Sequence, residues 1–180
     1  AMGGVADRPP SDSELAGMLA NVTEGMEAGA VGLSTGLVYE PGRYASTEEV
    51  VALSKVVGKH GGLYVSHMRD EGSGLLDSVR ETLHIGESSG TAVEISHHKS
   101  VGKTNWGMVT QSLEMIEEAI AQGRDVTADQ YPYTARSTML FALVQNGTFN
   151  DSEGGAMGKS EPSEVLLCSV PGHEDYEGRT

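Results

Sequence analysis

Hydrophobic positions along the chain alternate between two spacings, one typical of helices and one typical of strands. Spacings of three and four residues predict four amphipathic helices, with apolar faces at Leu15, Met18, Leu19, Val22 and Met26; at Val50, Leu53 and Val57; at Leu75, Leu76, Val79 and Leu83; and at Val109, Leu113, Ile116 and Ile120. Short β-rich runs begin near residues 31, 63, 92 and 125, between these helices. Successive runs are about 30 residues apart, the length of one strand with its returning helix.

This repeated unit predicts an α/β fold in which parallel strands alternate with helices through right-handed crossovers. A (β/α)8 barrel and a doubly wound open sheet both produce the pattern, so periodicity alone does not choose between them. The glycine fingerprint of a dinucleotide-binding turn is missing, which weakens the second alternative. The chain has 180 residues, whereas a complete barrel typically needs roughly 250. We therefore expect a partial TIM-type barrel that belongs to something larger.

Three segments follow from this interpretation. Residues 1–10 are expected to be a linker or a remnant of cloning, and residues 11–140 to be central βα units of the barrel. Residues 141–180 are expected to form a polar loop and the start of an inserted segment. Within that segment, the apolar run Val165–Ser169 is a candidate for a further strand.

Charge and cysteine content limit the classes of partner. The 26 acidic and 12 basic residues give a net charge of −14, which argues against binding nucleic acid or an anionic membrane surface. No apolar run approaches the length of a membrane span. The one cysteine, Cys168, cannot form an internal disulfide, so a reduced, cytoplasmic setting is expected.

Two histidines stand at equivalent points of neighbouring units. His67 and His97 each close a short β-rich run that begins after a glycine. Because the carboxyl ends of parallel strands meet at one end of a barrel, the two imidazoles are candidate ligands of a single metal ion. A lone histidine at a strand end is more often a hydrogen-bonded structural residue, and the repetition is what favours the metal.

The residues beside these histidines suggest roles in the same pocket. Arg69 could bind a carboxylate or brace the site. His98 should face the opposite side of the strand, and Lys99 should turn back toward the site. The Lys99 ammonium could neutralise an anionic substrate group or simply be solvated. Asp129 could act as an acid or base, or cap the following loop.

Aromatic and hydroxyl side chains follow the strands as well. Tyr131 and Tyr133 could donate hydrogen bonds to a substrate carbonyl, or could pack over the barrel mouth. Tyr39 and Ser137 lie in loops after their strands and could shape the same pocket.

Four motifs in register carry a resemblance to a known family: Gly29–Leu37 (GAVGLSTGL), Ser66–Glu71 (SHMRDE), Ile95–Lys99 (ISHHK), and Tyr131–Tyr133 (YPY) with Ser137–Leu140 (STML). They look like the N-acyl-D-amino-acid deacylases, the D-aminoacylases of the amidohydrolase superfamily, and the similarity runs from about residue 10 to residue 140. The resemblance implies a metal-dependent (β/α)8 barrel. It also implies hydrolysis of the amide bond of N-acyl-D-amino acids, which yields a carboxylate and a free D-amino acid.

The resemblance also implies residue roles. His67 and His97 correspond to two histidines that bind zinc, and Arg69 corresponds to a supporting residue. The substrate-pocket positions are Tyr39, Lys99, Tyr131 and Ser137. The implied mechanism is attack by a zinc-activated water with an aspartate as general base.

Several parts of the family's site have no match in this chain. They are a His-x-His pair, a cysteine ligand and the catalytic aspartate, and Cys168 lies after the matched region. The chain therefore looks like a central fragment of the barrel, with the general base outside it. Two other functions stay open: a dihydroorotase-like cyclic amidohydrolase, and a non-catalytic α/β fragment that self-associates through open sheet edges.

We predict that the purified 180-residue chain has negligible activity on N-acyl-D-methionine, because it lacks the aspartate and a third zinc ligand. The measurement is amide hydrolysis together with zinc content. Turnover by the purified chain would contradict the predicted incompleteness. Turnover of a cyclic amide alone would favour the dihydroorotase-like function.

Overall fold

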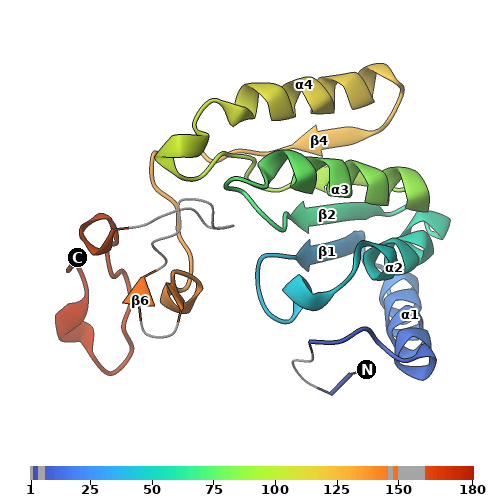
Figure 1. The fold of residues 1–180 in the computed structure, drawn as a ribbon. Helices are drawn as coiled ribbons and strands as arrows, with labels where there is room; N and C mark the ends of the chain where they lie inside the picture. The colour runs from blue at the N-terminus through green and yellow to red at the C-terminus, as the bar shows by residue number, and fades with distance from the viewer. Residues whose placement is uncertain (1, 4–6, 146–147, 150–160) are drawn as a thin grey trace.

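A computed structural model describes residues 2–3, 7–145, 148–149 and 161–180. Its main body is a sheet of four parallel strands: β1 (Gly32–Gly36), β2 (Leu63–His67), β3 (Ala92–Ile95) and β4 (Val126–Ala128). The helices are α1 (Asp12–Glu27), α2 (Thr47–Lys59), α3 (Leu75–Ser89) and α4 (Met108–Ala121). Helices and strands alternate along the chain (Figure 1), so the predicted βα repeat is confirmed.

Shorter elements lie in the connections and after the sheet. An antiparallel pair joins β5 (Val144–Gln145) to β6 (Thr148–Phe149). The described residues also form the 3-10 turns η1 (Gly42–Tyr44), η2 (Lys103–Asn105), η3 (Leu140–Ala142), η4 (Pro162–Glu164) and η5 (Glu174–Tyr176). The segment 161–180 lies beyond the carboxyl ends of the strands (Figure 1).

Local sequence signals explain where the helices begin and end. At the start of α1, Ser11 Oγ accepts from Glu14 N and the Glu14 carboxylate accepts from Ser11 N, which forms a capping box. Ser46 caps α2 by accepting from Glu49 N. Helix α3 ends at Gly90, whose φ of 71° lies in the left-handed region where glycine is favoured.

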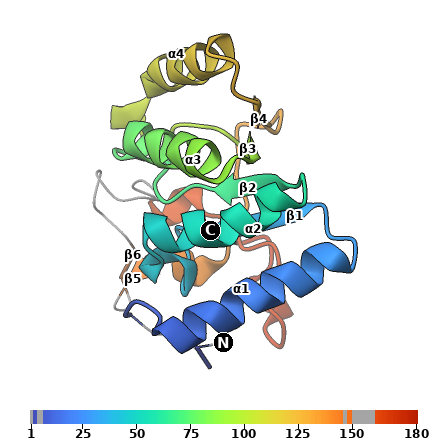
Figure 2. The ribbon, with the colours of Figure 1, turned by 90° about the vertical axis from the view of Figure 1, so that its right-hand side faces the viewer.

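The order of the strands distinguishes the two folds that periodicity left open. Sequential strands are neighbours throughout, in the order β1-β2-β3-β4, and all pairs are parallel. A doubly wound sheet reverses its strand order and carries helices on both faces. Here α2, α3 and α4 lie on one side of the sheet (Figure 2), which is the arrangement of a barrel wall.

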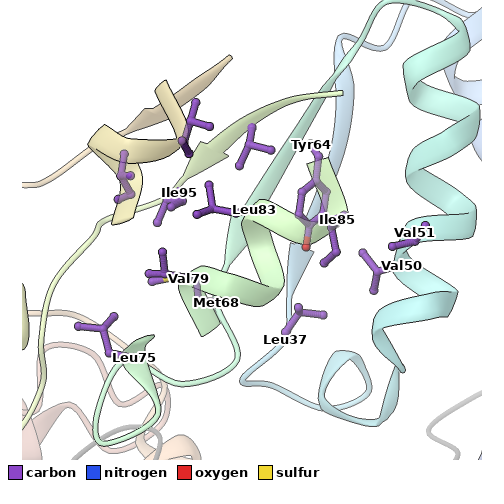
Figure 3. Close-up of a cluster of buried hydrophobic side chains, with 14 residues drawn as sticks. Leu37, Val50, Val51, Tyr64, Met68, Leu75, Val79, Leu83, Ile85 and Ile95 are labelled. Carbon is purple, nitrogen blue, oxygen red and sulfur yellow. The ribbon is translucent and has the colours of Figure 1, made fainter. Parts of the chain in front are cut away.

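The core fills the space between that face and the helices. Tyr64, Val93, Ile95 and Val126 project from the strands, and they meet helix residues that include Val50, Leu75, Val79, Ile85 and Ile116 (Figure 3). The buried Tyr64 hydroxyl is satisfied by hydrogen bonds with Thr35 Oγ1 and Ser66 Oγ, which avoids the cost of an unpaired polar group.

None of the described α-helices covers the opposite face of the sheet. The register places Ser34, Val65 and Glu94 on this face, together with Leu63, Ala92 and Thr127, and none of these residues is fully buried. Alternate residues of a strand point to opposite faces, so His67 at the end of β2 also belongs to this face. In a closed barrel this face would be the interior.

Two details of the predicted secondary structure are wrong. Val165–Ser169 is not a strand, although Leu167 exchanges backbone hydrogen bonds with Gly178 and Arg179. Strand β3 ends at Ile95, so His97 lies in the turn that follows it. Most of the polar loop expected after residue 140 falls on residues 146–147 and 150–160, outside the described part. Among the described residues, no helix combines the length and apolar character needed to span a membrane.

A substitution at Gly58 tests the close packing of α2 against α3, and a substitution at Gly25 in α1 is its control. A Cβ at Gly58 would lie 2.5 Å from the Ser89 carbonyl oxygen, so Gly58→Ala should destabilise the chain by about 1–3 kcal/mol. Gly25 in α1 has no heavy atom within 4 Å of a built Cβ, so Gly25→Ala should stabilise the chain by about 0.5–1 kcal/mol. Urea unfolding measures both changes, and a stabilising Gly58→Ala would contradict the packing described here.

Candidate metal centre

His67 ends β2 and presents an imidazole nitrogen that none of the described residues satisfies. Its register partner on β1 is Gly36, which leaves room for Tyr39 on the same side. The Nε2 atom of His67 is buried and has no hydrogen-bond partner among the described residues. Burial lowers the pKa of His67 to about 4, so the ring is neutral at pH 7 and Nε2 or Nδ1 offers a lone pair to a cation.

His97 reaches the same place from a strained turn rather than from a strand. Its φ is 41°, in the left-handed region that non-glycine residues seldom occupy. The backbone N–H of His97 donates to Asp129 Oδ1 at 2.6 Å, and His98 N donates to the Asp129 carbonyl at 2.8 Å. Asp129 therefore holds the turn after β3, whereas the sequence suggested an acid or base, or a cap for the loop that follows Asp129 itself.

The two imidazoles are in contact. Their ring centroids are 4.3 Å apart, in an edge-on arrangement with an interplanar angle of 72°. This confirms the expectation that His67 and His97 lie close together at one end of the sheet. Both rings lie at the carboxyl end of the strands, where barrel enzymes carry their active sites.

Glu71 completes the cluster, and sequence reasoning did not single it out. Its side chain is 1% exposed, and Oε1 lies 2.9 Å from His97 Nδ1 and 2.6 Å from Lys99 Nζ. Burial alone would raise the pKa of Glu71, but the hydrogen bond from His97 and the charge of Lys99 bring it below its ordinary value. His67, Glu71 and His97 each offer a ligand atom, and these atoms lie within 4.8 Å of one another.

The loop after β2 explains how Glu71 is placed. Asp70 Oδ1 accepts from Gly72 N at 2.7 Å and Asp70 N donates to Ser78 Oγ at 2.9 Å, which fixes the turn into α3. The Glu71 carbonyl accepts from Val101 N at 2.7 Å and so joins this loop to the one after β3. A signal existed in the sequence, since Glu71 follows the strand-end His67 by four residues.

Lys99 lies in the site, as predicted. Besides Glu71 Oε1, its Nζ donates to the His97 carbonyl at 3.0 Å, and it lies 5.6 Å from the centre of the Tyr131 ring. Burial lowers the pKa of Lys99, and Glu71 opposes that change. His98 faces away, with Nε2 2.9 Å from Ser112 Oγ on α4, so the two side chains do diverge. They do so from a turn, because β3 has already ended.

Aromatic side chains flank the histidines. The Tyr39 ring is 4.8 Å from that of His67, and the Tyr131 ring is 6.4 Å from that of His97, measured between centroids. The Tyr39 hydroxyl is 3.0 Å from Thr138 Oγ1. Ser137, next to Thr138, is exposed, and no described contact joins it to either histidine.

Arg69 lies outside the cluster. Its guanidinium makes two hydrogen bonds with the Glu81 carboxylate, at 3.0 and 2.9 Å. It also donates to the carbonyls of Arg43 and Ala45, at 2.9 and 3.0 Å. Arg69 therefore braces the connection between β1 and α2, which carries Tyr39, and supports the site only through that loop.

The donor set suits a zinc ion. Neutral imidazole nitrogens and a carboxylate oxygen are ordinary zinc ligands. The unsatisfied Nε2 of His67 is the specific sign, because a buried polar atom without a partner is costly unless something else binds it. His67 and His97 fit the role of ligands, and Glu71 fits either a third ligand or a partner that holds His97.

Comparison with known proteins gives close relatives for this arrangement. No family model matches the chain. A D-aminoacylase from Alcaligenes xylosoxydans xylosoxydans is 44% identical over 133 residues, which cover 74% of this chain and 27% of that protein. A solved D-aminoacylase, described as defining a novel subset of amidohydrolases, matches with a TM-score of 0.82 and 34% identity over 99% of this chain and 34% of its own.

A second solved relative carries a metal. It is the N-acyl-D-glutamate deacylase from Bordetella bronchiseptica, complexed with zinc and with a phosphonate that mimics the tetrahedral intermediate of its reaction. It matches with a TM-score of 0.69 and 39% identity, over 71% of this chain and 27% of its own. The present chain thus spans about a third or less of the relatives it matches, and the likeness confirms the predicted fold class of a partial TIM-type barrel.

Replacing Asp129 tests whether its carboxylate holds the His97 turn. Asp129→Ala removes the acceptor of the His97 N–H and should lower the free energy of unfolding by about 1 kcal/mol. Asp129→Asn keeps an Oδ1 acceptor and should stay close to the parent chain. Urea unfolding measures both, and an equal loss in the two variants would contradict the proposed bond.

Proposed function

Because this chain is a relative of the N-acyl-D-amino-acid deacylases of the amidohydrolase superfamily, we propose that it carries part of the active site of a zinc-dependent hydrolase. The reaction is cleavage of the amide bond of N-acyl-D-amino acids to a carboxylate and a D-amino acid. The observation that carries the proposal is the unsatisfied Nε2 of His67, buried beside His97 at the carboxyl end of the sheet.

In this proposal His67 and His97 hold the zinc ion. Bound there, zinc would supply a Lewis acid for the hydrolytic water and the amide carbonyl. The low pKa of His67 supports the assignment, because a neutral imidazole is the form that binds a metal. The uncovered face of the sheet leaves the site open on its inner side, where the remaining strands of a barrel would close it.

Lys99 is proposed to bind the carboxylate of the substrate. An ammonium group has three hydrogens, and two of them point to Glu71 Oε1 and the His97 carbonyl. One donor is left for an anionic ligand. Tyr131, over which Lys99 lies, and Tyr39, beside His67, are proposed to contact the scissile group through their hydroxyls.

Ser137 and Arg69 have no described contact with the histidines, and their proposed roles are less direct. Ser137 is proposed to line the substrate pocket, next to the Thr138 that meets Tyr39. Arg69 is proposed as a supporting residue through its hold on the β1–α2 connection. The general-base aspartate is proposed to lie outside these 180 residues, since Asp129 already accepts from the backbone of His97.

The same proposal divides the chain at the predicted boundaries. Residues 11–140 contribute βα units of the barrel, residues 1–10 precede them, and residues 141–180 begin an inserted segment. A cytoplasmic location is consistent with the lone free Cys168. The chain by itself is inactive in this proposal and self-associates through the outer edges of β1 and β4, which pair with no further strand among the described residues.

Zinc titration of histidine variants tests the metal site. The 180-residue chain should bind one zinc ion weakly, and His67→Ala or His97→Ala should reduce the affinity at least tenfold because each removes a ligand. The control is His84→Ala, which changes an exposed histidine on α3. Isothermal titration calorimetry measures the affinities of the parent chain and the three variants, and unchanged binding by His67→Ala would reject the proposed site.

A further inference from the structure

We propose that Glu71 is a positioning residue that fixes the tautomer of His97 and keeps Lys99 beside it. The inference rests on the proposed zinc site and adds to it the group that decides which nitrogen of His97 can face the metal. In this arrangement Glu71 acts through its two neighbours and does not bind the metal itself.

One oxygen of the Glu71 carboxylate contacts both neighbouring side chains. Glu71 Oε1 lies 2.9 Å from His97 Nδ1 and 2.6 Å from Lys99 Nζ. A carboxylate oxygen only accepts hydrogen bonds. The contact with His97 is therefore favourable only when Nδ1 carries a proton.

A competing arrangement is less favourable at the same distances. Lys99 Nζ is also 3.0 Å from His97 Nδ1, so the ammonium could in principle donate to an unprotonated Nδ1. That would leave the unprotonated Nδ1 2.9 Å from Oε1 of the Glu71 carboxylate, in a site where the side chain of Glu71 is 1% exposed. Repulsion at that distance is weakly screened in a buried site. Lys99 has two other acceptors, Glu71 Oε1 and the His97 carbonyl.

The tautomer has a direct consequence for the site. With the proton on Nδ1, the unprotonated nitrogen of a neutral His97 is Nε2, the atom free to bind a cation. In the part of the chain that the structure describes, Nε2 of the neighbouring His67 ring also has no hydrogen-bond partner. The two histidines thus present the same nitrogen.

The backbone of His97 is fixed independently of its ring. Asp129 Oδ1 accepts from the His97 N–H while φ stays at 41°. One carboxylate holds the main chain and the other holds the side chain. Glu71 is in turn held by its own carbonyl, which accepts from Val101 N. A histidine whose backbone and ring are both held loses little conformational freedom when a metal binds.

A matched pair of substitutions separates positioning from simple stability. Glu71→Met removes the acceptor at similar volume and leaves Lys99 without its carboxylate. Glu81→Met likewise removes the carboxylate that binds Arg69, and the hydrogen bonds between Arg69 and Glu81 lie away from the histidines. Both variants should lose stability, but only Glu71→Met should affect His97.

The decisive readout needs no metal. Nitrogen-15 NMR of the metal-free 180-residue chain should find His97 protonated at Nδ1 in the parent and in Glu81→Met, and shifted toward the Nε2 proton in Glu71→Met. Zinc affinity should fall about 10–100-fold in Glu71→Met and stay within about threefold in Glu81→Met. His97 that keeps its Nδ1 proton in Glu71→Met would overturn the inference.

A second variant covers the case in which Glu71→Met does not fold. Glu71→Gln keeps a neutral acceptor, so His97 should stay protonated at Nδ1 while the Nδ1 proton resonance moves upfield as the charged acceptor is lost. An unchanged resonance in Glu71→Gln would overturn the inference.

The two readouts keep the inference and the proposed function apart. A tautomer shift in a chain that binds no zinc would reject the proposed function and leave the positioning role standing. Zinc binding that depends on His67 and His97, with an unchanged tautomer in Glu71→Met, would reject the positioning role alone.

Discussion

The arrangement of the site depends on the contacts of one buried carboxylate oxygen, Glu71 Oε1. This atom meets the ring of His97 and the ammonium of Lys99, so it joins the loop after β2 to the loop after β3. Charge-assisted hydrogen bonds of this kind are strong because the interior screens them weakly. Without the carboxylate, Lys99 would be left as a partly buried charge without its partner, and the two loops would lose their shared side-chain contact.

The sheet supplies the frame on which that contact forms. Sequential pairing without a reversal brings the ends of β1, β2 and β3 to one edge, and α2, α3 and α4 lie on one face of the sheet (Figure 2). The alternation of side chains along β2 places His67 on the other face. The same topology explains why Leu63 and Val65 are only partly buried. Their side chains belong to a surface that the rest of a barrel would cover, and the chain spans 27% of the curated relative it matches with 44% identity.

Much of the fold could be predicted from the sequence because its signals are local. The four helices, the four parallel strands and the pairing of His67 with His97 follow from apolar spacing and from the repeat. The strand expected at Val165–Ser169 was wrong because an apolar run forms a strand only where a neighbouring strand pairs with it, and none of the described sheet strands reaches it. The turn at His97 depends on a hydrogen bond to Asp129, 32 residues away in sequence, which no local pattern reveals.

The site was predicted less completely than the fold. His67, His97, Lys99, Tyr39 and Tyr131 do converge in the structure. The importance of Glu71 was missed because a carboxylate in a polar loop looks like any solvated one, and only tertiary contact buries it. Arg69 was predicted to bind a carboxylate or to brace the site; its guanidinium binds the Glu81 carboxylate on α3 and braces the β1–α2 connection.

Zinc-edge X-ray absorption of the zinc-loaded chain tests the central claim most directly. Two imidazole nitrogens at about 2.0–2.1 Å from the metal, with no sulfur, would agree with a site built on His67 and His97. A sulfur ligand at about 2.3 Å would contradict it; Cys168, the one cysteine of the sequence, would be its source. A coordination shell without imidazole would contradict it as well.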